Sequence, residues 1–276
     1  MTEEDRVYLA DTLGIRTILD LRHPDELAFV EGTHALAERV FALSIFREDV
    51  SQEELIAELN GLFGTGPSPR RYLHYLEVGG DRLAQAFALF ADEANYPILV
   101  HCVAGKDRTG VLLGMVMDVL GCSDEDIAHE YGLSDASIDR LIAYLRDQGR
   151  QLEGTEEEIR ARLSTPPERM AGFIELLRER HGSSEAFFAG QGIGSAEIAR
   201  VRALLVGERV GATQFERRWP GGGPQPPGRD SASPDSCVAG EGFIDEVDAS
   251  LLDFATAAKE YPGMSPACLK VTGSGG

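Results

Sequence analysis

A cysteine and an arginine lie six positions apart in residues 101–110, which read His-Cys-Val-Ala-Gly-Lys-Asp-Arg-Thr-Gly. Cysteine is a nucleophile as its thiolate, and a guanidinium can donate two parallel hydrogen bonds to one phosphoryl group. A helix N-terminus and neighbouring cationic side chains favour the thiolate. Attack by Cys102 on a phosphate ester held by Arg108 would form a phospho-cysteine intermediate, which water would then hydrolyse. The pattern therefore predicts that both residues are catalytic in phosphoryl transfer.

The backbone between these two residues is predicted to bind the phosphate. In a turn that leads into a helix, successive N–H groups can converge on one anion, and the helix N-terminus adds positive potential. Gly105 permits a close approach of the backbone because it has no side chain. Lys106 is the only lysine in the first 258 positions, where arginine serves every other cationic need, so an ammonium group at this site indicates a specific role. The predicted substrate-binding residues are Val103, Ala104, Gly105, Lys106 and Thr109.

The two chemical steps need two proton transfers. The leaving oxygen must be protonated and the attacking water must be deprotonated, so a carboxylate within reach is required. Asp107 is the carboxylate nearest to the loop in sequence, and it is predicted to be the general acid and base. Asp49, in the segment Phe46-Arg-Glu-Asp49, is the second candidate, and its alternative interpretation is a solvated loop carboxylate.

Four other polar side chains are expected to support the loop. Thr109 can offer its hydroxyl to the Cys102 sulfur, or it can cap the helix that follows. His101 is expected to orient the loop through hydrogen bonds from its ring. Asp20 and Arg22 stand at the end of an expected strand, and we interpret them as an ion pair that fixes the sheet beside the loop.

Composition narrows the classes of partner. With 46 acidic and 26 basic residues, the net charge is −20, which disfavours an extended surface for nucleic acid or anionic membrane. No apolar run reaches the roughly 18 residues of a membrane span, and the acidic N-terminus does not resemble a secretory signal. The four cysteines show neither a Cys-x-x-Cys pair nor metal-ligand spacing. We therefore expect a cytoplasmic protein with reduced thiols and without a metal or cofactor.

The periodicity of apolar residues predicts an α/β fold. The run at 109–120 suits a helix that is buried on most sides, and the short segment at 97–101 before it reads as a strand. Two further strands are expected at 15–21 and 39–45, and the capping-box sequence at 51–54 predicts a helix start. Strands confined to the first part of the chain, with helices alone behind them, indicate a small, mainly parallel sheet flanked by helices. The other expected helices span 3–13, 52–63, 81–94, 124–130, 136–149, 155–163, 167–180 and 195–206.

The last quarter of the chain differs in composition from the rest. Residues 207–240 are rich in glycine and proline, which is typical of a linker. Apolar residues at spacings of three or four over 243–261 predict one amphipathic helix in a flexible tail at 241–276. The predicted organisation is a catalytic domain at 1–206, then this linker, then this tail.

The loop at 101–110 resembles that of the cysteine-dependent phosphatases. Its Gly-Lys-Asp-Arg variant is similar to the atypical, lipid-phosphatase-like family of bacterial tyrosine phosphatases that includes the mycobacterial phosphatase B group. The resemblance covers about 1–206. Other matching segments are Asp20-Leu-Arg22 with Glu26, Leu120-Gly-Cys-Ser-Asp-Glu-Asp-Ile127 with Tyr131, Gly182-Ser-Ser-Glu185, and Gly192-Ile-Gly-Ser-Ala-Glu-Ile198.

The resemblance implies the fold of that family and assigns the same roles within the loop. Cys102 would be the nucleophile, Arg108 would bind phosphate, Lys106 would assist phosphate or inositol-ring recognition, and Asp107 would be the acid. Family members usually begin with a further segment that contains an Asn-Phe-Arg-Asp-x-Gly-Gly-like motif and a strand. This sequence has neither before Glu3. We therefore expect part of one sheet edge and of the site wall to be missing.

The predicted function is that of a protein-tyrosine phosphatase. Lys106 favours a broader range that includes phosphoserine, phosphothreonine or phosphoinositides, because an added cation can pair with a second phosphate. The expected partner is thus a phosphorylated protein or a phosphoinositide. The main alternative is a catalytically impaired phosphate-binding module. Sulfur transfer by a rhodanese-like loop is disfavoured, because the residues from Lys106 to Gly110 suit phosphate better.

Overall fold

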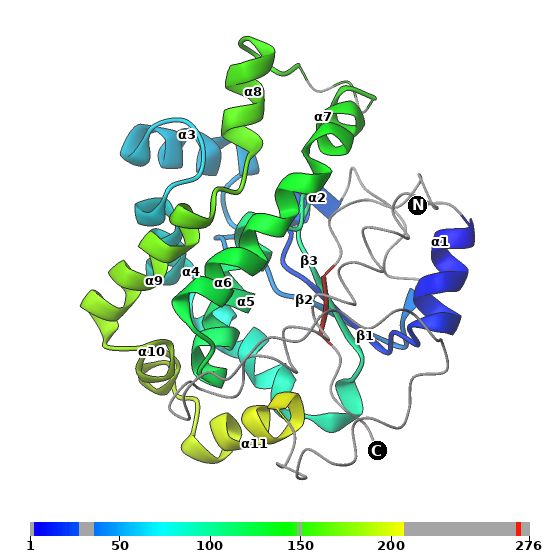
Figure 1. The fold of residues 1–276 in the computed structure, drawn as a ribbon, viewed down its shortest axis with the longest axis vertical. Coiled ribbons are helices and arrows are strands. Elements are labelled where there is room, and N and C mark those ends of the chain that lie inside the picture. Colours follow the sequence, from blue (N-terminus) through cyan, green and yellow to red (C-terminus); the bar gives the residue numbers. More distant parts are fainter. Residues whose placement is uncertain (1–2, 28–35, 148, 150, 207–268, 272–276) are drawn as a thin grey trace, which may run out of the picture.

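A small sheet and the helices on both of its faces make up the part of the chain that the computed structural model describes, namely residues 3–27, 36–147, 149, 151–206 and 269–271 (Figure 1). The sheet has the strand order β2-β1-β3-β4. The first strand pairs in parallel with both of its neighbours, and β4 is antiparallel to β3. The mainly parallel sheet predicted from the sequence is therefore confirmed. The strands are β1 (Thr17–Asp20), β2 (Arg39–Ala42), β3 (Ile98–His101) and β4 (Leu269–Val271).

The two central strands bury both of their faces, as strands of a parallel sheet between helices do. Side chains alternate along a strand, so Leu19 and Val100 face the main core while Ile18 and Leu99 face a smaller core on the other side. The register pairs Asp20 with His101 at the carboxyl ends of β1 and β3. The Asp20-Leu-Arg22 segment and the cysteine loop consequently leave the sheet side by side.

Most of the predicted helices are present, and α5 (Asp107–Leu120) is the buried central helix that its apolar run indicates. The N-terminal helix α1 (Glu3–Val7) continues as a π-helical turn, η1 (Tyr8–Thr12). One seven-residue helix, α10 (Ser184–Gly190), was not expected. The remaining helices are α2 (Pro24–Leu27), α3 (Gln52–Phe63), α4 (Pro69–Ala88), α6 (Asp124–Gly132), α7 (Ile138–Asp147), α8 (Glu156–Leu163), α9 (Pro167–His181) and α11 (Ser195–Val206).

The helix expected at 81–94 has the wrong bounds. It begins twelve residues earlier, as α4 (Pro69–Ala88), and two 3-10 turns follow it. Ser68 caps this helix and Pro69 occupies its first turn, where proline is favoured, so the helix begins there. Gly79 has non-helical angles of −135° and 24°, which kink the helix without ending it.

The kink at Gly79 lets α4 pass close to the segment after β2. A Cβ atom at Gly79 would lie 2.0 Å from the backbone oxygen of Ile45. This is a steric clash between two backbone segments, neither of which can move away easily. We expect Gly79→Ala to lower the free energy of unfolding by about 3 kcal/mol, measured by urea denaturation. Gly61→Ala is the control, because this exposed position in α3 has no atom within 4 Å, and alanine there should stabilise by about 0.5–1 kcal/mol. Equal effects at both positions would contradict this account of the kink.

The predicted linker at 207–240 and the predicted tail helix at 243–261 lie outside the described residues. Three residues of the tail are described, and they form β4 at the free edge of β3, with Val100 opposite Leu269. Among the described residues, none of the helices combines the length and the apolar character that crossing a bilayer requires.

Candidate active site

The cysteine loop joins the end of β3 to the start of α5. Cys102 follows the strand directly and is 4% exposed. Residues 103–106 form bends, and Gly105 has a φ angle of 66°, a conformation that favours glycine. Within the part of the chain that the structure describes, no hydrogen bond occupies the backbone N–H groups of 103–109. These groups are available to an anion at the N-terminus of α5.

Arg108 lies beside this loop and is held by a carboxylate from another element. Its Nη1 and Nη2 atoms donate to the two oxygens of Glu26 on α2 at 2.5 and 2.9 Å, and Nη1 also donates to the Leu21 carbonyl at 3.2 Å. Burial on its own lowers the pKa of Arg108, but the charges of Cys102 and Glu26 raise it above the ordinary value for arginine. The Cys102 charge is the largest of the raising causes.

The contacts of Arg108 leave one edge of its guanidinium open. Arginine has five N–H donors, and the two bonds to Glu26 and the one to Leu21 use three of them among the described residues. The two remaining N–H groups, on Nε and Nη2, are parallel to each other. They can therefore donate to two oxygens of one phosphoryl group. The Phe46 ring lies with its centre 5.7 Å from the guanidinium carbon. Glu26 thus fixes one edge of the guanidinium and leaves the Nε and Nη2 donors, which are predicted to bind phosphate, unobstructed.

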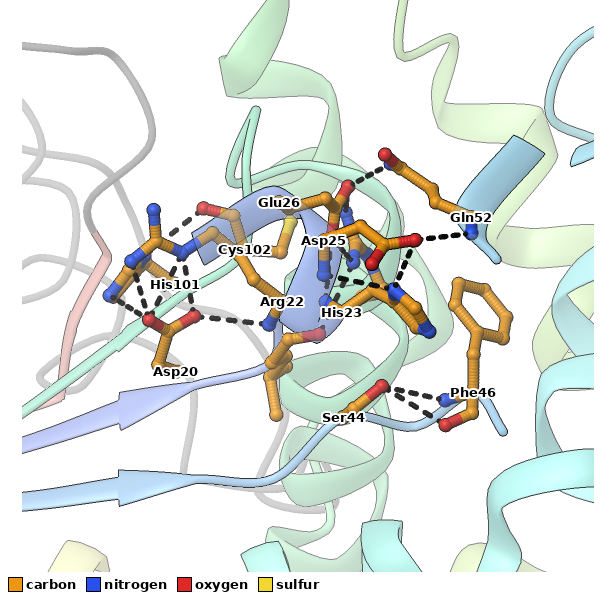
Figure 2. A network of polar contacts seen from close by, with 12 residues as sticks. Asp20, Arg22, His23, Asp25, Glu26, Ser44, Phe46, Gln52, His101 and Cys102 are labelled. Atoms are coloured by element: carbon orange, nitrogen blue, oxygen red, sulfur yellow. Dashed lines mark hydrogen bonds and ion pairs between the residues drawn. The ribbon is translucent and has the colours of Figure 1, made fainter. Parts of the chain in front are cut away.

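The carboxylate of Glu26 is itself fixed by hydrogen bonds from its surroundings. It accepts from the His23 backbone N–H at 2.7 Å and from the Gln52 side chain at 2.6 Å, and its neighbour Asp25 accepts from the Gln52 backbone at 2.9 Å (Figure 2). A buried carboxylate needs such hydrogen-bond partners to offset its loss of contact with water. The short helix α2 and Gln52, the first residue of α3, therefore fix the position of the carboxylate that binds Arg108.

The supporting residues lie at the ends of β1 and β3, as their sequence positions predicted (Figure 2). Arg22 and Asp20 form a buried ion pair with an Nη2–Oδ2 distance of 2.7 Å. His101 contacts the Cys102 carbonyl through Nδ1 at 3.0 Å. Because a carbonyl only accepts, Nδ1 carries the proton, and Nε2 faces an oxygen of Asp20 at 3.6 Å. This chain of contacts orients the strand end that carries the nucleophile.

Asp107 and Lys106 form an ion pair at the start of α5. The Lys106 ammonium donates to both oxygens of Asp107, at 3.0 and 2.8 Å, and Asp107 also accepts from the Tyr72 hydroxyl. Burial alone would raise the pKa of Asp107, but the Lys106 charge and these hydrogen bonds hold it below its ordinary value. The Lys106 side chain is 5% exposed and that of Asp107 is 26% exposed. The predicted acid therefore reaches the surface, while the lysine lies beneath it.

The other site residues predicted from the sequence differ in their burial and in their contacts. Val103, Ala104 and Gly105 are partly buried in the loop, where their amides can contribute to binding. The Thr109 hydroxyl is buried and, among the described residues, has no hydrogen-bond partner, so the bond expected to the Cys102 sulfur is not formed. Asp49 is exposed in the loop between β2 and α3, and no described residue forms a hydrogen bond or ion pair with it.

Sequence reasoning missed Glu26, Tyr72 and Phe46 as parts of this site. Glu26 belongs to a four-residue helix and contacts a residue 82 positions away, so no local pattern indicates that it is buried. Tyr72 lies in the segment of α4 that was not predicted to be helical. The only signal available for Glu26 was its place behind the Asp20-Leu-Arg22 segment in the family resemblance.

Comparison with known proteins places this geometry in a family. Residues 1–207 match the model described as the tyrosine phosphatase family. A tyrosine-protein phosphatase from Nostoc commune is 24% identical over 219 residues, which cover 74% of this chain and 70% of that protein. The triple specificity protein phosphatase PtpB of Mycobacterium tuberculosis is 32% identical over 125 residues, which cover 41% of this chain and 45% of that protein. An inositol diphosphatase, SIW14, from Saccharomyces cerevisiae is 33% identical over 92 residues, or 32% of each chain.

The matches differ in extent, since the chain spans less than half of the mycobacterial and yeast relatives. The family model nevertheless covers most of the 276 residues, and it includes the three parallel strands β1, β2 and β3, the cysteine loop and the helices up to α11. The fold implied by the resemblance of the loop is also the fold observed. The chain therefore belongs to the tyrosine phosphatase family.

Proposed function

We propose that this protein hydrolyses phosphotyrosine through a phospho-cysteine intermediate on Cys102. The observation that carries this proposal is the buried cysteine beside Arg108, below the N-terminus of α5 and its open backbone amides. A thiolate there is the nucleophile, and the amides and the open edge of the guanidinium bind the three non-bridging oxygens. Charge that spreads over these oxygens in the transition state meets donors already in place.

The reaction has two displacements at phosphorus. In the first, the sulfur–phosphorus bond forms while the bond from phosphorus to the leaving oxygen breaks, and a proton passes to that oxygen from the protonated form of Asp107, which is the minor form because the pKa of Asp107 is lowered. In the second, the Asp107 carboxylate takes a proton from water, the water oxygen bonds to phosphorus, and the thiolate of Cys102 leaves. Inorganic phosphate is released, and both residues return to their starting states.

The range of substrates is proposed from the names of the relatives and from the charge at the site. Among the relatives are a triple specificity protein phosphatase and inositol diphosphatases. We therefore include phosphoserine, phosphothreonine and phosphoinositides as secondary substrates of this chain. Because the Lys106 ammonium is engaged by Asp107, phosphotyrosine, which carries one phosphate, is the substrate that the site favours.

The rest of the organisation is proposed on the same basis. Residues 1–206 form the catalytic domain, since the family match ends at 207. Residues 207–240 link it to the tail at 241–276. We place the protein in the cytoplasm, where a catalytic thiol stays reduced.

The proposal is tested by trapping the intermediate. We expect the full chain to release phosphate from 4-nitrophenyl phosphate and from a phosphotyrosine peptide, with inhibition by vanadate. Rapid acid quench followed by mass spectrometry of peptides should find one phosphoryl group on the peptide that contains Cys102. Binding of the phosphopeptide in calorimetry without any release of phosphate would instead identify a phosphate-binding module.

A further inference from the structure

A chain of polar side chains leads from Arg169 on α9 through two buried tyrosines to Asp107. The Arg169 guanidinium on α9 donates to the Tyr131 hydroxyl on α6 at 3.1 Å. The Tyr131 and Tyr72 hydroxyl oxygens are 2.7 Å apart, and the Tyr72 hydroxyl on α4 donates to an oxygen of Asp107. Tyr72 is fully buried. Three helices that are separate in the sequence therefore converge on one carboxylate at the start of α5.

The two ends of this chain fix the direction of every hydrogen bond in it. Arginine only donates and an ionised carboxylate only accepts. The single proton of the Tyr72 hydroxyl is used for Asp107, so the hydroxyl of Tyr131 must donate to Tyr72. Each bond then polarises the next one towards the carboxylate. The chain thus delivers a strengthened donor to the oxygen that Lys106 also contacts.

We infer that Tyr72, supported by Tyr131 and Arg169, is a positioning residue that orients the carboxyl group of Asp107 and sets the pH range over which it exchanges its proton. This inference rests on the proposed function of Asp107 as acid and base. The ring of Tyr72 is held independently of its hydroxyl, by edge contacts with Tyr131 and Phe173 at centroid distances of 6.2 and 6.0 Å. The hydroxyl can therefore be removed without loss of the ring packing.

The charged and titratable groups around Asp107 all shift its pKa in the same direction. Lys106 on its own element, Tyr72 on α4 and Arg169 on α9 all favour its ionised form and so lower its pKa. The charge of Asp107 in turn raises the pKa values of Tyr72, Tyr131 and Tyr75, whose burial is the larger cause. These tyrosines remain protonated donors throughout the neutral range.

The test is the pH dependence of turnover by the Tyr72→Phe variant. Loss of a hydrogen bond that favours the ionised carboxylate should raise the pKa of Asp107 and move the alkaline limb of kcat/KM up by about one pH unit. Lost orientation should lower the maximal kcat about tenfold for phenyl phosphate, whose leaving oxygen needs a proton. The loss should be smaller for 4-nitrophenyl phosphate, whose leaving group is stable as an anion. KM should change little.

Three further variants make the result specific. Tyr96→Phe is the matched control, because this buried tyrosine donates to the Phe90 carbonyl at 2.7 Å and its hydroxyl has no part in the chain to Asp107. Its pH profile should equal that of the unaltered protein. Tyr131→Phe should shift the limb in the same direction as Tyr72→Phe but by less, and it provides the test if Tyr72→Phe does not fold. Adding Tyr72→Phe to Asp107→Asn should produce no further loss of kcat.

The outcomes separate this inference from the proposed function. If the unaltered protein turns over and Cys102→Ser does not, the proposed function stands. Under those conditions, profiles for Tyr72→Phe and Tyr131→Phe that coincide with the Tyr96→Phe profile would overturn the inference alone. Equal losses for the two substrates, or additive losses in the double variant, would also overturn it. Absence of turnover in the unaltered protein would remove the basis of both.

Discussion

Replacing Cys102 by serine is expected to abolish turnover, with kcat falling by a factor of about 10⁶, as for removal of the nucleophile in other covalent mechanisms. A serine hydroxyl is not ionised at neutral pH, and the carboxylate of the loop, that of Asp107, is bound to Lys106 and Tyr72. The substitution changes one buried atom, and the contact from His101 to the carbonyl of residue 102 is unaffected. Steady-state hydrolysis of 4-nitrophenyl phosphate measures the loss.

The same variant should still bind phosphotyrosine peptide, because the loop amides and Arg108 do not depend on the sulfur. Calorimetry on the inactive variant would then report binding without turnover. Cys122→Ser is the control, since Cys122 is buried just beyond the far end of the fourteen-residue helix α5, roughly 20 Å away. It should retain the rate of the unaltered protein. A Cys102→Ser protein that keeps most of its rate would rule out the thiolate mechanism.

The parts of the fold that could be predicted from the sequence are those fixed by local interactions. The capping box of Ser51 and Glu54 forms as predicted, because all of its donors and acceptors lie within four residues. The strand, loop and buried helix around Cys102 were likewise predicted from adjacent segments. The start of α4 was not, because proline and glycine are ambiguous signals until the segments that pack against them are known.

The residues of the site likewise divide into those predicted from a local motif and those brought in from distant positions. Cys102, Asp107 and Arg108 were predicted as a group because a span of seven residues contains all three. The partners that orient them come from distant positions, with Tyr72 at 35 residues from Asp107 and Tyr131 at 59 from Tyr72. A tyrosine in an amphipathic helix is usually part of a core, so composition and spacing do not distinguish one that donates to the carboxylate of Asp107.

The position of Lys106 adds a partner that its rarity did not suggest. An ammonium in the loop was expected to contact phosphate or an inositol ring directly, but it lies beneath Asp107 and donates to both of its oxygens. Lysine suits this place because it presents a compact charge on a flexible stem, whereas the planar guanidinium is used at Arg108 to form a fork. The predicted contact of Lys106 with phosphate stays a prediction.

Replacing Arg108 by lysine is expected to have the second largest effect, lowering kcat/KM about 10³-fold at unchanged net charge. Arginine groups that stabilise a transferring phosphoryl group contribute 10³–10⁵ in rate, and a lysine keeps the charge but loses the second parallel donor. The ammonium still pairs with Glu26, so the buried carboxylate keeps a partner and the thermal unfolding temperature should fall by only a few degrees. Steady-state kinetics on an aryl phosphate, with unfolding followed by circular dichroism, measures both.

Glu26→Gln separates positioning from direct binding at the same arginine. Glutamine keeps one acceptor oxygen for Arg108, but it loses the negative charge and the second acceptor oxygen. The guanidinium should therefore become less well oriented, while its open edge can still bind phosphate. We expect a loss of about tenfold in kcat, far smaller than for Arg108→Lys. If Glu26→Gln reduced activity as much as Arg108→Lys, the guanidinium would owe its effect to the Glu26 pair rather than to its Nε and Nη2 donors. The order of the two losses therefore tests which edge of Arg108 faces the substrate.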